Sequence, residues 1–211
     1  MSKYIIGERY HIFNRGVEKR DVFMDTHDYQ RFIEGLREFN TVQPIGNLRD
    51  TMQYKKALQE LNTCSKPLVK IIAYCLNSNH YHLILEEIIE GGISEFMKRV
   101  SGGYTLYFNK KYERSGALFQ GRYKKVLINS NEYLLYLSAY VNQNHYIHGY
   151  KEANWLYSSL LEYQNKRQGG LCDKRIIMEQ FNNNVLDYVK FMNLNAEYLK
   201  DKKEFSKLIL E

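Results

Sequence analysis

Two β-rich segments separated by three turn-forming residues constrain the fold of this chain more than any other feature. The segments are LVKIIAYCL (68–76) and HYHLILEE (80–87), and the tripeptide NSN lies between them. Runs rich in β-branched and aromatic residues, bounded by Asn and Ser, are typical of strands joined by a tight turn. The pattern therefore predicts an antiparallel hairpin, and the chain must build a sheet around it.

The other segments supply strands and helices in a regular order around this hairpin. The alternation in RYHIFNRG (9–16) predicts a first strand, with His11 and Phe13 on one face. Helical periodicity is found at 25–40, 91–112 and 130–148, and a further strand is expected at 123–128. The adjacent glycines Gly102 and Gly103 are a candidate point for an interruption or kink in the second helix.

The order strand–helix–strand–strand–helix–strand–helix predicts an α+β fold. It is typical of a ferredoxin-like (RRM-like) antiparallel sheet with helices packed on one face, which leaves the other face for function. We expect residues 1–150 to form this domain, with 41–67 as an insertion between the first helix and the second strand, including a helical piece at 52–61. Residues 151–211 are expected to form a C-terminal helical extension.

The composition excludes several classes of protein. The three cysteines are far apart and form no CxxC motif, so neither a structural zinc site nor a disulfide framework is expected. The N-terminus lacks the layout of a signal peptide, and glutamates break the longest apolar runs before they could span a bilayer. We therefore expect a cytoplasmic protein with no membrane partner.

The positive charge of the chain is concentrated in one segment. Residues 98–125 contain eight Lys or Arg residues and one acid, whereas the whole chain has a net charge of +6. Aromatic residues are interleaved with these charges, and basic side chains neutralise phosphates while aromatic rings stack on bases. Part of the pattern also fits a solvated helix whose aromatics point inward. The concentration of one sign of charge favours a nucleic acid as partner.

The second strand of the hairpin begins with two histidines separated by one residue. Alternation places His80 and His82 on the same face and Tyr81 on the opposite face. Paired imidazoles on a rigid strand can be two ligands of a divalent metal ion. Taken alone, such a pair is more often hydrogen-bonded packing, so a metal site requires a third ligand.

The helix at 130–148 offers such a ligand. Tyr136, Tyr140 and Asn144 follow one another at intervals of four and so share a helix face. If this face leans over the sheet, Asn144 can offer an amide oxygen to a metal ion and a tyrosine can act as a nucleophile. Spacing alone does not choose among the tyrosines, since Tyr133 and Tyr146 are equally available.

Three motifs in order resemble the single-tyrosine HUH transposases, which include the IS200-type transposases and the REP-associated tyrosine transposases. The motifs are HYH (80–82), SGALFQGRYKKVLI (115–128) and NEYLLYLSAYVNQN (131–144). The similarity runs from YHIFNRG to YIHGY, and WLYSSLLEYQ resembles a segment that often follows in the family.

The resemblance implies a DNA transposase, or single-strand endonuclease, that cleaves and rejoins hairpin-bearing single-stranded DNA. Tyr140 is the implied catalytic nucleophile, attacking a phosphodiester to give a 5′-phosphotyrosine and a free 3′-hydroxyl. The implied cofactor is Mg²⁺ or Mn²⁺, held by His80, His82 and Asn144. Gln143 is one position out of register with the family's amide ligand and is therefore a weaker candidate.

The resemblance also gives the basic segment a role in holding the DNA strand or the foot of its hairpin. The residues we expect to do so are Arg15, Lys110, Lys111, Arg114, Arg122, Lys124 and Lys125. Tyr136, His11 and Gln143 are second-tier candidates for the site. We expect His11 to be a hydrogen-bonded core histidine that can approach the site. The other histidines, His27, His145 and His148, are expected on helix surfaces.

Two alternatives come from other functional classes. One is a domesticated module that binds DNA or RNA hairpins without cleaving them, and the other is an HUH relaxase or replication initiator. Members of the resembled family occur as dimers and as monomers, so a homodimer is allowed and the sequence does not decide the oligomeric state.

Overall fold

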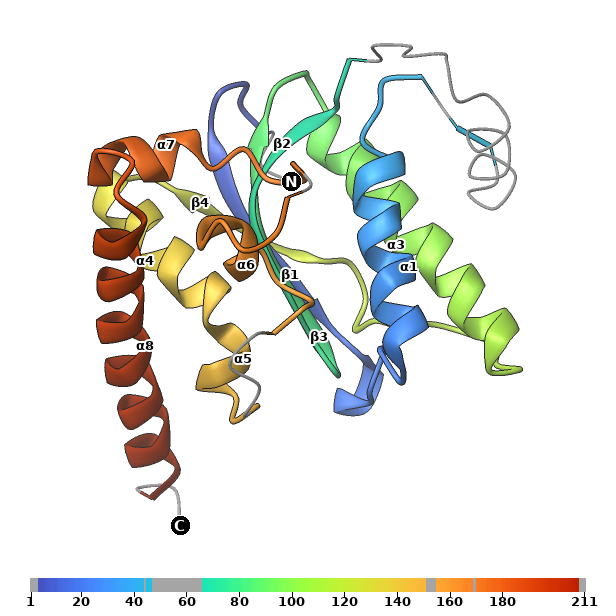
Figure 1. Cartoon of the computed structure of the whole chain (residues 1–211). Coiled ribbons are helices and arrows are strands. Elements are labelled where there is room, and N and C mark those ends of the chain that lie inside the picture. The colour runs from blue at the N-terminus through green and yellow to red at the C-terminus, as the bar shows by residue number, and fades with distance from the viewer. Residues whose placement is uncertain (1–3, 44, 47–65, 151–154, 169, 209–211) are drawn as a thin grey trace.

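The centre of the molecule is an antiparallel sheet of four strands in the order β2-β3-β1-β4 (Figure 1). The computed structural model describes residues 4–43, 45–46, 66–150, 155–168 and 170–208, with side chains up to 201. The strands are β1 (Arg9–Arg15), β2 (Val69–Asn77), β3 (His80–Glu87) and β4 (Lys124–Ile128). This order and these pairings confirm the predicted ferredoxin-like sheet.

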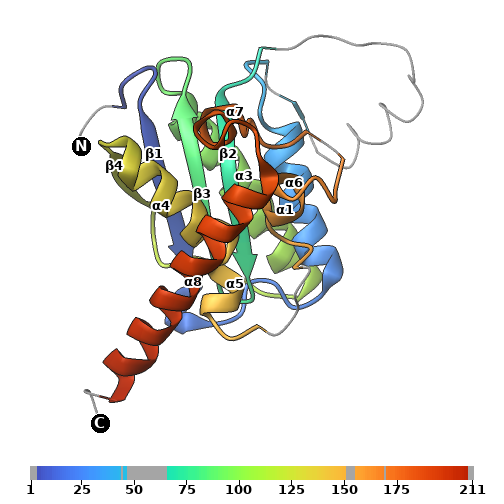
Figure 2. The ribbon, with the colours of Figure 1, turned by 60° about the vertical axis from the view of Figure 1, so that its left-hand side comes forward.

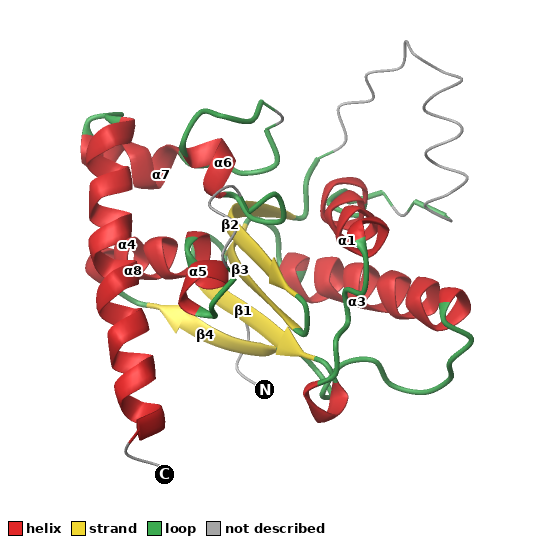
Figure 3. Ribbon diagram, turned by 60° about the horizontal axis from the view of Figure 1, so that its bottom comes forward, coloured by secondary structure: helices red, strands yellow, loops and turns green. Residues whose placement is uncertain are grey.

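Helices lie on both faces of the sheet (Figure 3). One face is covered by α1 (Thr26–Glu38) and α3 (Gly92–Lys111), and the other by α4 (Asn131–Asn142) and α5 (Asn144–Ile147). The face that was expected to be free of helices is therefore covered in part by α4, the helix that carries Tyr140. The C-terminal segment adds α6 (Leu160–Tyr163), α7 (Arg175–Met178) and α8 (Val185–Leu208). Short 3-10 helices occur at Val17–Lys19 and Glu179–Phe181.

The predicted hairpin is formed by β2 and β3, with Ser78 and Asn79 between the strands. A register shift between Ile71 and Ala73 interrupts the regular pairing of β2 with β3. Beyond this shift the strands pair regularly up to the turn. The alternation of side chains is therefore well defined where the hairpin carries its two histidines.

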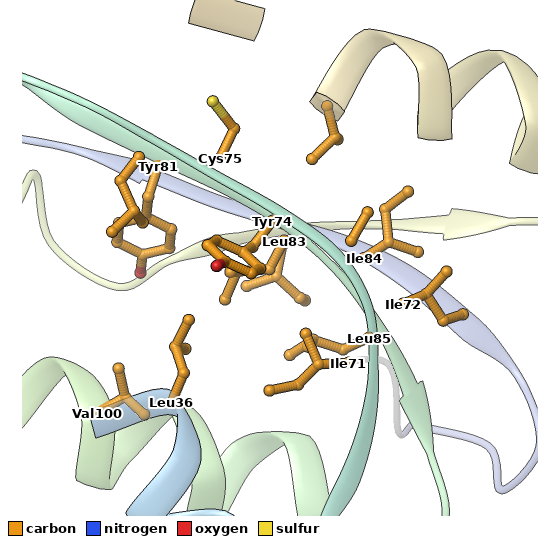
Figure 4. Packing of buried hydrophobic residues seen from close by; sticks show 14 of the residues in the cluster. Leu36, Ile71, Ile72, Tyr74, Cys75, Tyr81, Leu83, Ile84, Leu85 and Val100 are labelled. Carbon is orange, nitrogen blue, oxygen red and sulfur yellow. The ribbon is translucent and has the colours of Figure 1, made fainter. Parts of the chain in front are cut away.

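The side chains of β3 divide between two apolar layers. Tyr81, Leu83 and Leu85 point toward α1 and α3, whereas Ile84 points to the opposite face (Figure 4). The Tyr81 ring is fully buried, and its centroid is 5.1 Å from that of Phe32 on α1. Tyr81 therefore has the packing role expected of it, on the side of the sheet away from the two histidines.

Helix α3 runs without interruption through the two glycines at which a kink was considered. A Cβ atom at Gly103 would lie 3.0 Å from Cε2 of Phe39, which follows the end of α1. The missing side chain thus lets α3 approach the end of α1, and it does not mark a break in the helix.

Most of the predicted insertion at 41–67, including all of its helical piece at 52–61, lies outside the described residues. In the part of the chain that the structure describes, no helix is both long and apolar enough to cross a membrane.

A buried carboxylate ties α1 to α3. Asp28 is fully buried and accepts hydrogen bonds from the hydroxyls of Tyr107 and Tyr112 and from the backbone N–H of Met24. The Lys111 ammonium lies 2.7 Å from Asp28 Oδ1, which supplies the opposite charge that a buried carboxylate requires. Lys111 also binds the N-cap carboxylate of α1, Asp25, whose pKa is lowered mainly by this contact.

We expect Lys111→Ala to lower the free energy of unfolding by about 1–3 kcal/mol, because it removes a charged donor from a buried carboxylate. Urea denaturation followed by circular dichroism measures the change. The control is Lys110→Ala, at the exposed neighbouring position, which should change stability by less than about 0.5 kcal/mol. Equal effects of the two substitutions would contradict a structural role for Lys111.

Candidate active site

The histidine pair lies at the start of β3, on the face covered by α4. His80 and His82 are 5% and 8% exposed. Strand β1 places Arg15 opposite His80 and Phe13 opposite His82. Directly opposed residues of antiparallel strands project from the same face, and the ring centroids of Phe13 and His82 are 5.7 Å apart. The pair is thus fixed by a sheet that is packed on both sides.

A neighbouring amide fixes the tautomer of His80. Its Nδ1 is 2.6 Å from Oδ1 of Asn79, and Nδ2 of Asn79 donates to the carbonyl oxygen of Lys19. The amide oxygen therefore faces the imidazole, and Nδ1 of His80 carries a hydrogen that it donates to Asn79. Nε2 of His80 lies 3.0 Å from Nδ2 of Asn77 and 3.2 Å from Oδ1 of Asn144 on α5, so its lone pair can accept a hydrogen bond or bind a metal ion.

The second histidine is paired with His11 of β1. Nδ1 of His82 lies 2.8 Å from Nε2 of His11, and the rings stack with centroids 5.0 Å apart. Burial lowers the pKa of His11 to about 4 and that of His82 well below its usual value, with the neighbouring imidazoles adding to the second shift. Both rings are therefore neutral at neutral pH, and one hydrogen lies between them. His11 is thus in direct contact with His82.

Two asparagine side chains complete the cluster. Oδ1 of Asn144 is 3.2 Å from Nε2 of His80. Nδ2 of Asn77 lies 2.5 Å from Oδ1 of Asn144 and 3.0 Å from Nε2 of His80. Asn77 and Asn144 are both fully buried. The Asn77 amide is thus the shared donor for two neighbouring acceptors, Nε2 of His80 and Oδ1 of Asn144. Asn77 was predicted only as part of the turn, and no local signal distinguishes it from Asn79 as a contact of the site.

Helix α4 carries Tyr140 across this cluster. The Tyr140 ring centroid is 5.4 Å from that of His82 and 6.4 Å from that of His11, in both cases edge to face. Burial raises the pKa of the Tyr140 hydroxyl, and the side chain of Asn144 and the charge of Arg15 oppose this shift. Tyr140 is therefore a protonated phenol at neutral pH, placed beside neutral imidazoles.

The helix that carries Tyr140 does not continue to Asn144 as predicted. Helix α4 ends at Asn142, and Asn144 begins the single turn of α5. Gln143, at the break, donates from Nε2 to Oδ1 of Asn193 on α8 and so is turned toward the C-terminal helix. The pKa of Tyr136 is raised by burial and by Tyr198 and Tyr133, which places this tyrosine among other phenols.

The turn after α4 also corrects the prediction for two histidines. His145 is 2% exposed and stacks on Trp155, with a ring separation of 5.8 Å. His148 is partly buried, and its ring centroid lies 4.6 Å from that of His80. Both were expected on a helix surface, but His145 is buried against Trp155 and His148 lies beside His80 of β3. A signal for His148 was present, because it continues the four-residue spacing of Tyr140 and Asn144.

The strand register separates the candidate DNA-binding residues by face. Lys124 is opposite Phe13 in the pairing of β4 with β1, so Lys124 and Arg15 project on the histidine face. Lys125 projects on the other face, with its ammonium 3.8 Å from the centroid of the Tyr4 ring. The structure thus brings two of the basic candidates to the face of the site.

The remaining basic candidates lie in the segment between α3 and β4 and at the end of α3. Arg122 and Lys110 are exposed, and Nη1 of Arg114 donates to Oδ1 of Asn109. Lys111 holds the two aspartates of α1. Lys111 therefore has a structural role, and its expected contact with DNA stays a prediction.

The donor atoms of this cluster are of the kinds that bind a divalent cation, which would replace the hydrogen bonds from Asn77 to His80 and Asn144. In the described part of the chain, no three His, Cys, Asp or Glu side chains gather as metal ligands. A cation here would therefore need the amide oxygen of Asn144 in addition to the imidazoles. Nε2 of His80 and Oδ1 of Asn144 are lone-pair donors 3.2 Å apart, and the partners of the other ring nitrogens orient the imidazoles as such ligands require.

Comparisons with known proteins identify the class of protein as a transposase. Residues 8–144 match the family described as Transposase IS200 like. The match covers more than half of the chain, and this chain belongs to the IS200-like transposase family. A solved structure of a REP-associated tyrosine transposase bound to a REP hairpin shares the fold. The TM-score is 0.52 at 15% identity, over 82% of this chain and 92% of that chain. No curated protein matches the chain.

We expect Asn77→Ala to lower the free energy of unfolding by about 1–3 kcal/mol, because two buried acceptors lose their shared donor. Urea denaturation in the presence of a chelator measures the change. Asn193→Ala is the control, since it removes an amide partner at the exposed side of α8 and should cost less than about 0.5 kcal/mol. An Asn77→Ala variant as stable as the control would refute the role given to the Asn77 amide.

Proposed function

We propose that this chain cleaves and rejoins single-stranded, hairpin-bearing DNA, with Tyr140 as the nucleophile. The observation that carries the proposal is the position of the Tyr140 ring, 5.4 Å from that of His82 and next to the converging donor atoms of His80 and Asn144. Membership of the IS200-like transposase family supports DNA cleavage as the reaction. The neighbouring structure is described as bound to a REP hairpin, which supports hairpin DNA as the substrate class.

The proposed step is a transesterification. The Tyr140 hydroxyl oxygen attacks a phosphodiester, an O–P bond forms, and the bond from phosphorus to the 3′ oxygen breaks. The phenol proton leaves, the 3′ oxygen becomes a hydroxyl, and the 5′ end is held as a phosphotyrosine. Attack by a 3′-hydroxyl on that phosphotyrosine reverses the step and rejoins DNA, so no ATP is required.

The buried phenol requires activation. Because burial raises the pKa of Tyr140, only a small fraction of the hydroxyl is ionised at neutral pH. His80, His82 and Asn144 are the residues we propose to hold Mg²⁺ or Mn²⁺, which when bound polarises a phosphoryl oxygen and favours loss of the phenol proton. The contacts of His80 with Asn79 and of His82 with His11 keep both imidazoles oriented for this role.

Arg15 and Lys124 are the cations we propose to hold the scissile strand, because both project on the face of the histidine pair. Lys110 lies on α3, which covers the opposite face, and Arg122 lies close to residues of α3; both are exposed and are proposed to contact phosphates farther along the DNA. Such contacts neutralise phosphates and make binding depend on salt. They do not by themselves choose a DNA sequence.

The central prediction concerns the nucleophile. Wild-type protein incubated with 3′-end-labelled single-stranded hairpin DNA and Mn²⁺ should give a labelled covalent protein–DNA adduct on a denaturing gel, because the 5′ end of the downstream fragment remains on Tyr140. Tyr140→Phe should abolish the adduct. Tyr136→Phe, the matched control one helical turn earlier, should retain it.

An adduct that survives in Tyr140→Phe and is lost in Tyr136→Phe would move the nucleophile to Tyr136. Hairpin binding without an adduct, with metal present, would favour the hairpin-binding module over the enzyme.

A second prediction concerns the metal. Mn²⁺ at one hundred times its dissociation constant should stabilise the wild type by about 2.7 kcal/mol, seen as a higher midpoint of thermal unfolding. His80→Ala should lose this shift, because it removes one proposed ligand. His27→Ala, at an exposed position on α1, should keep the shift. An undiminished shift in His80→Ala would place the ion elsewhere.

A further inference from the structure

A buried polar side chain lies between the two residues on which the proposed chemistry depends. Asn142 is the last residue of α4, two positions after Tyr140 and two before Asn144. Its side chain is fully buried. Its amide nitrogen donates to the hydroxyl of Tyr188 at 2.8 Å, and its amide oxygen accepts from the hydroxyl of Ser159 at 2.6 Å. A buried amide satisfied on both sides defines one position for the end of the helix.

The contact with Ser159 connects this helix end to the sheet. The backbone N–H of Ser159 donates to the carbonyl oxygen of Tyr74 in β2, and the Tyr74 N–H donates to the Ser159 hydroxyl, both at 2.9 Å. The same segment pairs with β2 at Leu76, whose N–H donates to the carbonyl oxygen of Tyr157. Ser159 is therefore held by the strand that neighbours the histidine-bearing strand β3.

The contact with Tyr188 connects the helix end to the C-terminal helix. Helix α8 packs along α4 and α5 on the side away from the sheet (Figure 2). The Tyr188 ring is fully buried against Tyr163 and Phe181, with ring separations of 4.9 and 5.3 Å. Its hydroxyl lies 2.8 Å from Asn142 and 3.2 Å from Ser138, so one phenol bonds two successive turns of α4.

We propose that Asn142 is a positioning residue, which Ser159 and Tyr188 hold so that Tyr140 and Asn144 meet the histidine pair of the same chain. This inference rests on the proposed function of Tyr140 and adds a role for the C-terminal extension, which carries no catalytic motif of its own. The hydrogen bonds with Ser159, which β2 holds, and with Tyr188 of α8 both involve the side-chain amide of Asn142. Asn142 lies between Tyr140 and Asn144 in the sequence. Loss of either bond would let the end of α4 move relative to β3.

If the Tyr188 hydroxyl served only to stabilise the fold, its removal would affect stability and not the rate of adduct formation. Tyr163 provides a matched control that distinguishes this role from positioning. Tyr163 is fully buried beside Tyr188, and its hydroxyl donates to the carbonyl oxygen of Ile72 in β2 at 3.0 Å. Tyr163→Phe and Tyr188→Phe each remove one buried hydroxyl and keep the ring. Only Tyr188→Phe removes a hydrogen bond to α4.

The test measures single-turnover adduct formation with labelled hairpin DNA and Mn²⁺, the dissociation constant of the hairpin, and the midpoint of thermal unfolding. Small misplacements of reacting groups cost large factors in rate. We therefore expect Tyr188→Phe to slow adduct formation by about tenfold or more, with the hairpin dissociation constant unchanged. Tyr163→Phe should lower the unfolding midpoint by a similar amount and keep the wild-type rate.

Equal rates for the two variants, both folded at the assay temperature, would overturn the positioning role. A wild type that forms no adduct would overturn the proposed function, and the positioning role with it.

A mixture of two inactive proteins tests the same-chain part of the proposal. Tyr140→Phe supplies an intact histidine pair, and His82→Ala supplies an intact tyrosine. If the Asn142 contacts hold each helix to its own sheet, the mixture forms no adduct. An adduct in the mixture would show that the tyrosine helix is exchanged between copies and would overturn the proposal.

Discussion

The pairing of β1 with β3 is the constraint on which the rest of the structure depends. It is the central pair of the sheet, and it places Phe13 and Arg15 of β1 opposite His82 and His80 of β3. A shift of one residue in this register would turn the histidines into the apolar layer beneath α1 and α3. It would also separate His82 from His11, with which it shares a hydrogen. The fold and the site are therefore fixed by the same backbone hydrogen bonds.

Both faces of this sheet pack apolar side chains into one core, and each face also holds buried polar groups, such as the Asp28 carboxylate between α1 and α3. On the α1–α3 face, apolar side chains such as Tyr81 and Leu83 fill a continuous core. On the other face, buried amides and hydroxyls are paired with one another near the site, as with Asn77 at the histidines and Asn142 at the helix end. Apolar packing tolerates small shifts, whereas a buried polar group must meet its partner or lose about 1–3 kcal/mol. Buried polar contacts of this kind beside the site suit the proposed function, in which a nucleophile has to be placed accurately.

Much of the fold was predictable because its signals are local. Alternation and the NSN turn gave the hairpin, and the spacing of His80 and His82 gave their common face. Tyr140 was not singled out by spacing, and its selection came from resemblance to a family, to which the chain belongs. The prediction of one helix through Asn144 was wrong because Gln143 ends α4.

The parts that could not be predicted depend on contacts between distant segments. His145 is buried because Trp155 stacks on it, and no pattern near His145 reports that contact. The roles of Asn77 and Asn142 likewise need partners 67 and 46 residues away. Gly103 lies in an unbroken α3 close to the Phe39 ring, and the local sequence does not report that approach. Such long-range packing overrides local propensity.

The most direct test of the central claim is to identify the amino acid that is linked to DNA. The adduct formed by the full-length wild-type protein with a single-stranded hairpin and Mn²⁺ can be digested with nuclease and protease and analysed by tandem mass spectrometry. The account predicts a nucleotide attached through a 5′-phosphate to the phenol oxygen of Tyr140. A nucleotide on any other residue, or attached through a 3′-phosphate, would contradict it.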